Sequence, residues 1–191
     1  MHTRARSLLA VVAVTLLSSV PSGAQERAGL MGDLIRDVDD VQQKLVALAR
    51  EFPADKQGWR PSEGTRSVGE VLLHLASDNY LLPAFVGVKP DPATGIDPAD
   101  YSTLTTYERR QIPRDSVIAE LDRSFAHLRN AMLGLPDSRM DEKVTLFGQE
   151  MSVRRVMLLT TGHLHEHLGQ MIAYARSNDI VPPWSRPASG N

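Results

Sequence analysis

Residues Thr160–Arg176 read TTGHLHEHLGQMIAYAR, and this stretch decides the fold that we expect. It contains no proline. Together with the residues just before it, it carries mainly apolar residues at every third or fourth position. These positions are Val153, Val156, Thr160, Leu164, Leu168, Met171 and Ala175. Such spacing is typical of the buried face of an α-helix. The stretch therefore predicts a long amphipathic helix that packs against other helices.

Two histidines, His163 and His167, lie four residues apart within this stripe. On a helix, such residues stack on one side with Cβ atoms about 6 Å apart, so both imidazoles can reach one metal ion. His165 is turned by about 200° to the opposite face, and we expect it to be solvated. The alternative is a pair of packed core histidines, but burying two polar rings without partners costs several kcal/mol. A metal site would need a third ligand from elsewhere in the chain.

The same residues also fit H-x-x-E-H, an inverted zinc-protease signature in which Glu166 would be the general base. That site needs a further carboxylate ligand downstream. Only 24 residues follow His167, and Asp179 is the sole acid among them. Because a five-residue motif matches often by chance, we interpret Glu166 as an acid on the helix surface.

Three more segments carry helical stripes, at about 29–52, from Ser67 onward, and at about 114–135. The second opens with Ser67-Val68-Gly69-Glu70, which has the S-x-x-E form of a capping box. Between the second and third helices, residues 87–106 contain three prolines and no helical period, which indicates a long loop. Residues 144–148 suggest a short extended piece or a tight turn. The predicted fold is all-α, a four-helix bundle with a long crossover between helices two and three.

The second helix supplies the missing ligand, His74, at the edge of its buried face. In helical bundles, metal sites form from inward side chains on facing helices, so His74, His163 and His167 are our candidate metal ligands. Three histidines with an open position for water are typical of a catalytic site of the zinc type. Asp78, one turn beyond His74, is our candidate acid/base residue, or a partner for the spare N–H of His74. Glu70 is one turn before it, but the capping box already employs Glu70.

Residues 1–24 have the form of a signal peptide, with two early arginines, an apolar run at 8–17 and small residues before Gln25. The alternative is an uncleaved N-terminal anchor. Cleavage would export the protein to the periplasm or the medium as a chain of 167 residues. Residues 25–177 would then form the bundle, and residues 178–191 a proline-rich C-terminal tail.

The charge and the composition limit the partners, nucleophiles and metal ligands that the protein can use. Removing residues 1–24 takes away two arginines and no acids, so the net charge changes from −2 to −4, and the sequence has no basic block. A nucleic-acid partner is therefore not expected, because phosphate binding needs clustered Lys and Arg. There are no cysteines. Thiolate nucleophiles are excluded, and any transition metal must be held by histidine and carboxylate.

Over nearly the whole mature chain, the sequence resembles the DinB/YfiT-like superfamily of metal-binding four-helix bundles. The matching marks are Trp59-Arg60-Pro61, Ser67-Val68-Gly69-Glu70 with His74, His163-x-x-x-His167 with Gly169-Gln170, and Tyr174-x-Arg176 with Ile180-Val181-Pro182-Pro183. The resemblance implies a divalent metal, zinc or nickel, on His74, His163 and His167, and a homodimer. Some relatives are thiol-dependent transferases and one branch includes a maleylpyruvate isomerase. An exported chain departs from the pattern of the thiol-dependent transferases, because low-molecular-weight thiols are cytosolic.

Two functions are therefore expected. The first is a metal-dependent hydrolase or transferase that acts on a small substrate, with the ion activating water or polarising a carbonyl. The second is a non-enzymatic, metal-holding stress or interaction protein of the cell envelope, in which the ion mainly pins two helices. The residues do not identify a substrate.

Overall fold

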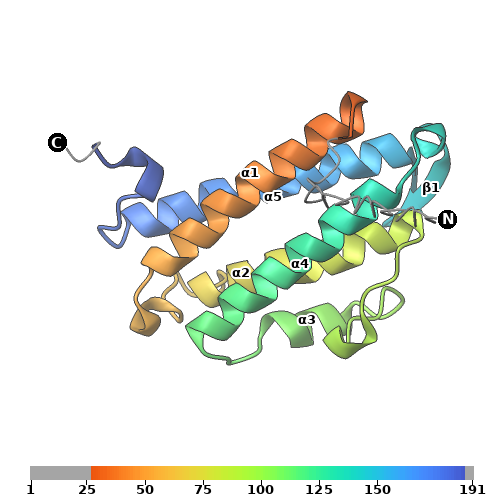
Figure 1. The fold of residues 1–191 in the computed structure, drawn as a ribbon. Coiled ribbons are helices and arrows are strands. Elements are labelled where there is room, and N and C mark those ends of the chain that lie inside the picture. Colours follow the sequence, from red (N-terminus) through yellow and green to blue (C-terminus); the bar gives the residue numbers. More distant parts are fainter. Residues whose placement is uncertain (1–26, 188–191) are drawn as a thin grey trace, which may run out of the picture.

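The computed structural model describes residues 27–187, and the predicted signal peptide lies outside them. Four long helices form the molecule: α1 (Gly29–Glu51), α2 (Val68–Leu81), α4 (Arg114–Gly134) and α5 (Val153–Arg176). Helices α1 and α2 each pack against both α4 and α5, which gives a four-helix bundle. Figure 1 shows α5 behind α1, with α2 and α4 forming the other half. The predicted fold class is confirmed.

The core of the bundle is apolar and comes mainly from the predicted stripes. Helix α2 is the most enclosed, since ten of its fourteen residues are buried. The largest fully buried side chains include Phe52, Leu72, Leu121, Phe125 and Leu128. Burial of such side chains stabilises the fold by roughly 1.5–3 kcal/mol each. No helix within residues 27–187 combines the length and apolar character needed to cross a bilayer.

Local signals fix where two of the helices start. The hydroxyl of Ser67 accepts a hydrogen bond from the Glu70 amide, and the Glu70 carboxylate accepts one from the Ser67 amide, so the capping box is complete. Ser152 caps α5 by accepting a hydrogen bond from the amide of Arg155. These bonds satisfy amides that the first turn of a helix leaves without partners.

The crossover differs from the prediction, because it contains a short helix, α3 (Ser102–Glu108), preceded by the 3-10 turns η2 (Leu82–Val86) and η3 (Pro92–Thr94). The buried ring of Tyr107 anchors α3, and its hydroxyl donates a hydrogen bond of 2.5 Å to Glu120 of α4. Helix α3 packs along α2, as Figure 1 shows below the bundle. Tertiary contacts to α2 and α4, and not a repeating stripe, hold this helix in place.

A β-hairpin joins α4 to α5. Strands β1 (Lys143–Leu146) and β2 (Gln149–Ser152) pair antiparallel, with Leu146 opposite Gln149. The two turn residues, Phe147 and Gly148, both have positive φ, which matches the right-handed twist of a tight hairpin. The ring of Phe147 is 61% exposed and reaches toward the crossover, where it lies 5.6 Å from the ring of Phe85. Remaining short turns are η1 (Ala54–Lys56), η4 (Asp137–Arg139) and η5 (Pro183–Ser185).

Candidate metal centre

The structure brings His74 of α2 together with His163 and His167 of α5. One ring nitrogen from each can be chosen so that all three lie within 4.8 Å of one another. The ring centroids are 5.2 Å apart for His74 and His163, 4.7 Å for His74 and His167, and 4.4 Å for the α5 pair. Three imidazoles from two packed helices therefore converge on one point.

A carboxylate that we did not predict determines which ring nitrogen of His74 is available to a metal ion. Oε1 of Glu108, at the end of α3, lies 2.8 Å from Nδ1 of His74. Burial raises the pKa of Glu108, but the hydrogen bond and charge of His74 and the charge of Arg66 outweigh burial, so its pKa lies below the ordinary value. An ionised carboxylate only accepts hydrogen bonds, so Nδ1 of His74 carries a hydrogen, and when the ring is neutral its Nε2 is the nitrogen with the free lone pair.

A second chain of hydrogen bonds orients His167. Nδ1 of His167 lies 2.7 Å from Oε1 of Gln170, whose amide nitrogen donates to the hydroxyl of Tyr174 at 3.0 Å. That hydroxyl donates in turn to the backbone oxygen of Arg66 at 3.0 Å. Because Tyr174 fixes which end of the Gln170 amide faces His167, Nδ1 of His167 must donate and Nε2 is free. Partners of this kind orient metal-binding histidines.

The electrostatics keep His167 neutral at neutral pH. Burial, helped by the positive charges of His163, His74 and Arg66, lowers the pKa of His167 to about 4 against the opposing hydrogen bond with Gln170. Only a neutral imidazole can bind a metal ion. His167 is therefore in the form that a ligand requires, without any proton having to leave.

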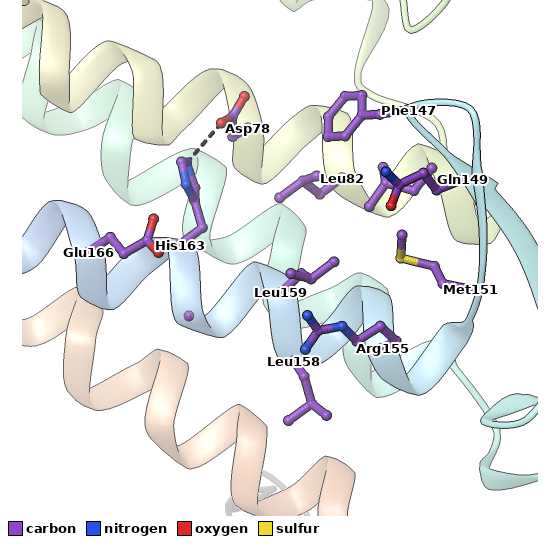
Figure 2. A pocket seen from close by; sticks show the side chains of 12 residues that line it. Asp78, Leu82, Phe147, Gln149, Met151, Arg155, Leu158, Leu159, His163 and Glu166 are labelled. Atoms are coloured by element: carbon purple, nitrogen blue, oxygen red, sulfur yellow. Dashed lines mark ion pairs between the residues drawn. The ribbon is translucent and has the colours of Figure 1, made fainter.

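Asp78 lies at the edge of the three rings. Its Oδ2 is 2.8 Å from Nε2 of His163, a contact marked in Figure 2, and 3.5 Å from Nε2 of His74. The approach to His163 lacks the angles of a hydrogen bond, and within residues 27–187 this buried nitrogen has no hydrogen-bond partner. A buried ring nitrogen without a partner is costly, and a metal ion would satisfy it.

The donor set fits a divalent transition metal. Two histidines have their Nδ1 atoms engaged and their Nε2 atoms free, and the third has an unpartnered Nε2. Imidazole suits zinc, nickel, iron and copper. Three imidazoles leave a coordination position that the protein does not have to fill.

The other predicted partners fall elsewhere. His165 is on the outer face of α5, where Nε2 lies 3.0 Å from Asp37 of α1, so it does not join the triad. Glu70 remains in its capping box and pairs with Arg60, and the expected bond from the spare N–H of His74 goes to Glu108 instead. Glu166 is exposed, and it lines a pocket that also includes His163.

That pocket has a volume of about 510 Å³ and opens beside the triad. Its walls come from α2, the hairpin and α5, as Figure 2 shows. Asp78 and His163 line one end. The side chain of His163 is 24% exposed, compared with 12% for His74, so the triad opens toward this pocket. Another pocket of about 610 Å³ borders Glu108 and Gln170 but includes none of the three histidines.

Comparisons with known proteins agree with this architecture. Residues 37–171 match the DinB superfamily. Two solved structures are similar to this fold, both at 14% sequence identity. A DinB-like protein of Bacillus subtilis, YjoA, has a TM-score of 0.60 over 82% of this chain and 99% of its own, and a DinB-like protein of Bacillus cereus has 0.66 over 81% and 95%. No curated protein matched the sequence. The match to the superfamily covers most of the sequence, so the chain belongs to the DinB superfamily.

Proposed function

We propose that this protein is a metal-dependent enzyme, a hydrolase or transferase for a small substrate, with zinc or nickel held by His74, His163 and His167. The observation that carries the proposal is the convergence of three imidazoles, two of them with fixed free nitrogens, beside an open pocket. A divalent ion in such a site activates water and polarises carbonyl groups.

Asp78 is the residue to which we assign proton transfer. Its carboxylate lies between the triad and the pocket, within 2.8 Å of one ligand nitrogen and 3.5 Å of another. A group bound in the pocket would meet this carboxylate and the ring of His163 together. General acid/base catalysis by one positioned side chain contributes about 10²–10⁴-fold to rate.

The same geometry also supports a structural role, because the triad joins α2 to α5. An ion that only pins the two helices would raise the melting temperature without supporting turnover. The open position and the pocket at His163 favour the enzyme. Export after removal of residues 1–24 and homodimer formation belong to the same proposal. Export rests on the form of residues 1–24, and the homodimer rests on the resemblance to the superfamily.

Metal content tests the ligand set. The wild type and the single variants His74→Ala, His163→Ala and His167→Ala would be purified and analysed by inductively coupled plasma mass spectrometry. We expect about one ion per chain in the wild type and a large loss in each variant. His165→Ala is the matched control, since His165 lies on the same helix but faces Asp37. Equal metal in the wild type and all three triad variants would contradict the ligand assignment.

Activity tests the catalytic role. The wild type would be screened against ester, amide and phosphoester substrates, with and without a chelator. We expect chelator-sensitive turnover that Asp78→Asn lowers by at least about 100-fold while metal stays bound. Glu166→Gln is the comparison within the same pocket, and we expect a small effect there. A larger loss from Glu166→Gln than from Asp78→Asn would favour the inverted-protease interpretation. Metal that raises the melting temperature without any turnover would favour the structural role.

A further inference from the structure

The pocket beside the triad has two chemically different ends. Figure 2 shows Asp78, His163 and Glu166 at one end, and Arg155 and Gln149 at the other. Between them the walls are apolar, formed by Leu82, Leu146, Phe147, Met151, Leu158 and Leu159. A pocket of this kind suits a ligand with an apolar body and a polar group at each end.

Arg155 is an exposed residue that lines this pocket and pairs with no acid in the part of the chain that the structure describes. Within residues 27–187 its guanidinium forms no ion pair and no hydrogen bond, whereas the adjacent Arg154 pairs with Asp141 at 2.6 Å. Arg155 also lies in the first turn of α5, where no acid is present and a cation opposes the helix dipole. An unpaired arginine in this position does not stabilise the helix.

The direction of the Arg155 side chain indicates where the anionic group of a ligand would bind. In Figure 2 the guanidinium of Arg155 extends along α5 in the direction of His163, as far as Leu158 and Leu159. Arg155 and His163 are eight residues apart, a rise of about 12 Å along a helix, which the reach of the guanidinium shortens. The carboxylates of Asp78 and Glu166 at the far end would repel an anion there and so direct it to Arg155.

We propose that this pocket binds an organic carboxylate of medium length, with its carboxylate on Arg155, its apolar chain along the leucines, and its other end at Asp78 and His163. A guanidinium suits this role because it pairs with a carboxylate through two parallel hydrogen bonds. The placement of the reacting end rests on the proposed function. The pairing of Arg155 with the ligand's carboxylate does not rest on the proposed function, since it involves no metal.

The first test uses the protein with a chelator present, so that no metal takes part. Binding of octanoate and of octanol would be measured by ligand-observed NMR and calorimetry. We expect the wild type to prefer octanoate, and Arg155→Gln to weaken octanoate binding roughly tenfold while leaving octanol unchanged. Arg154→Gln is the matched control and should bind octanoate like the wild type. Arg155→Lys should retain part of the preference.

A second variant tests the pocket itself. Gly162 lines it, and a Cβ added there meets no atom within 4 Å. Because glycine is a poor helix former, Gly162→Leu should leave α5 at least as stable while filling the pocket. We expect it to abolish binding of both octanoate and octanol. Melting temperatures of all variants would show that each is folded.

The outcomes separate this inference from the proposed function. Equal octanoate affinity in the wild type and Arg155→Gln would overturn the inference, as would a wild type that binds octanol as tightly as octanoate. In the metal-loaded protein, suberic acid monohydroxamate should bind more tightly than octanohydroxamate, and Arg155→Gln should remove the difference. Arg155-dependent octanoate binding in a wild type that takes up no metal would support the inference and contradict the proposed metal-dependent enzyme.

Discussion

Glu108 can be neutralised almost without changing its shape by the substitution Glu108→Gln. Its two carboxylate oxygens have different partners: Oε1 lies 2.8 Å from Nδ1 of His74, and Oε2 lies 3.0 Å from Nε of Arg66. Both partners donate. A glutamine amide has only one oxygen, so its NH₂ group must face one of the two donors. One of the contacts is therefore lost, and the remaining acceptor is uncharged.

The expected magnitude follows from what the lost charge does for His74. Residues that orient a metal-binding histidine contribute about 10–100-fold to metal affinity. Glutamine can keep one contact, so we expect the lower half of that range, a loss of about 10–30-fold. This corresponds to about 1.4–2 kcal/mol of metal-binding free energy. Glu108→Ala removes both contacts and should reach the upper half.

The assay is a competition for zinc between the protein and a chromogenic chelator at fixed pH. Glu142→Gln is the matched control, because Glu142 also pairs with an arginine, Arg139, but lies away from the triad. It should bind zinc like the wild type. Zinc affinity of Glu108→Gln within twofold of the wild type, with an unchanged melting temperature, would refute the role of Glu108. A fall in affinity equal to that of Glu142→Gln would refute it as well.

Two further predictions concern the stability of the bundle. His167 has a folded-state pKa of about 4, below its ordinary 6.5, so the unfolded chain takes up a proton before the folded chain does as the pH falls. The free energy of unfolding that comes from the neutral ring of His167 is fully present above about pH 6.5, and it is lost as the pH falls to about 4. With a chelator present, denaturant unfolding should show about 1–2 kcal/mol more loss over this window for the wild type than for His167→Gln, a figure reduced for the partial exposure of the ring. Equal losses would contradict the shift. Phe125 is fully buried, so Phe125→Ala should cost about 3–5 kcal/mol by the same method, whereas Leu133→Ala, at a partly exposed site, should cost far less.

The long helices were predictable because their signals are local and repeated. The stripe from Val153 to Ala175 and the cap at Ser152 fix α5, and the capping box at Ser67 fixes the start of α2. The prediction that the three histidines converge used only helical spacing and the rule that bundle helices turn their apolar stripes inward. Packing of α2 against α5 then brings His74 within reach of the other two.

Glu108 could not be predicted in the same way, because α3 has no stripe. Seven residues complete barely two turns, and only Tyr107 among them is buried. The position of that helix depends on tertiary contacts to Glu120 and to α2, which no local pattern in the sequence encodes. The partner of His74 is 34 residues away in the chain, whereas sequence spacing offered only its neighbours at one helical turn.

The pocket could not be predicted from the sequence for a related reason. Phe147 and Met151 of the hairpin form a wall opposite α5 only because the turn at Phe147 and Gly148 folds the hairpin back toward Phe85. In the sequence, Arg155 is one of two adjacent arginines that look equivalent. The structure distinguishes them, since Arg154 pairs with Asp141 while Arg155 lines the pocket. Which of two neighbouring arginines finds a partner is therefore determined by the tertiary fold, and that is why substitution of Arg155 should weaken ligand binding while substitution of Arg154 should leave it unchanged.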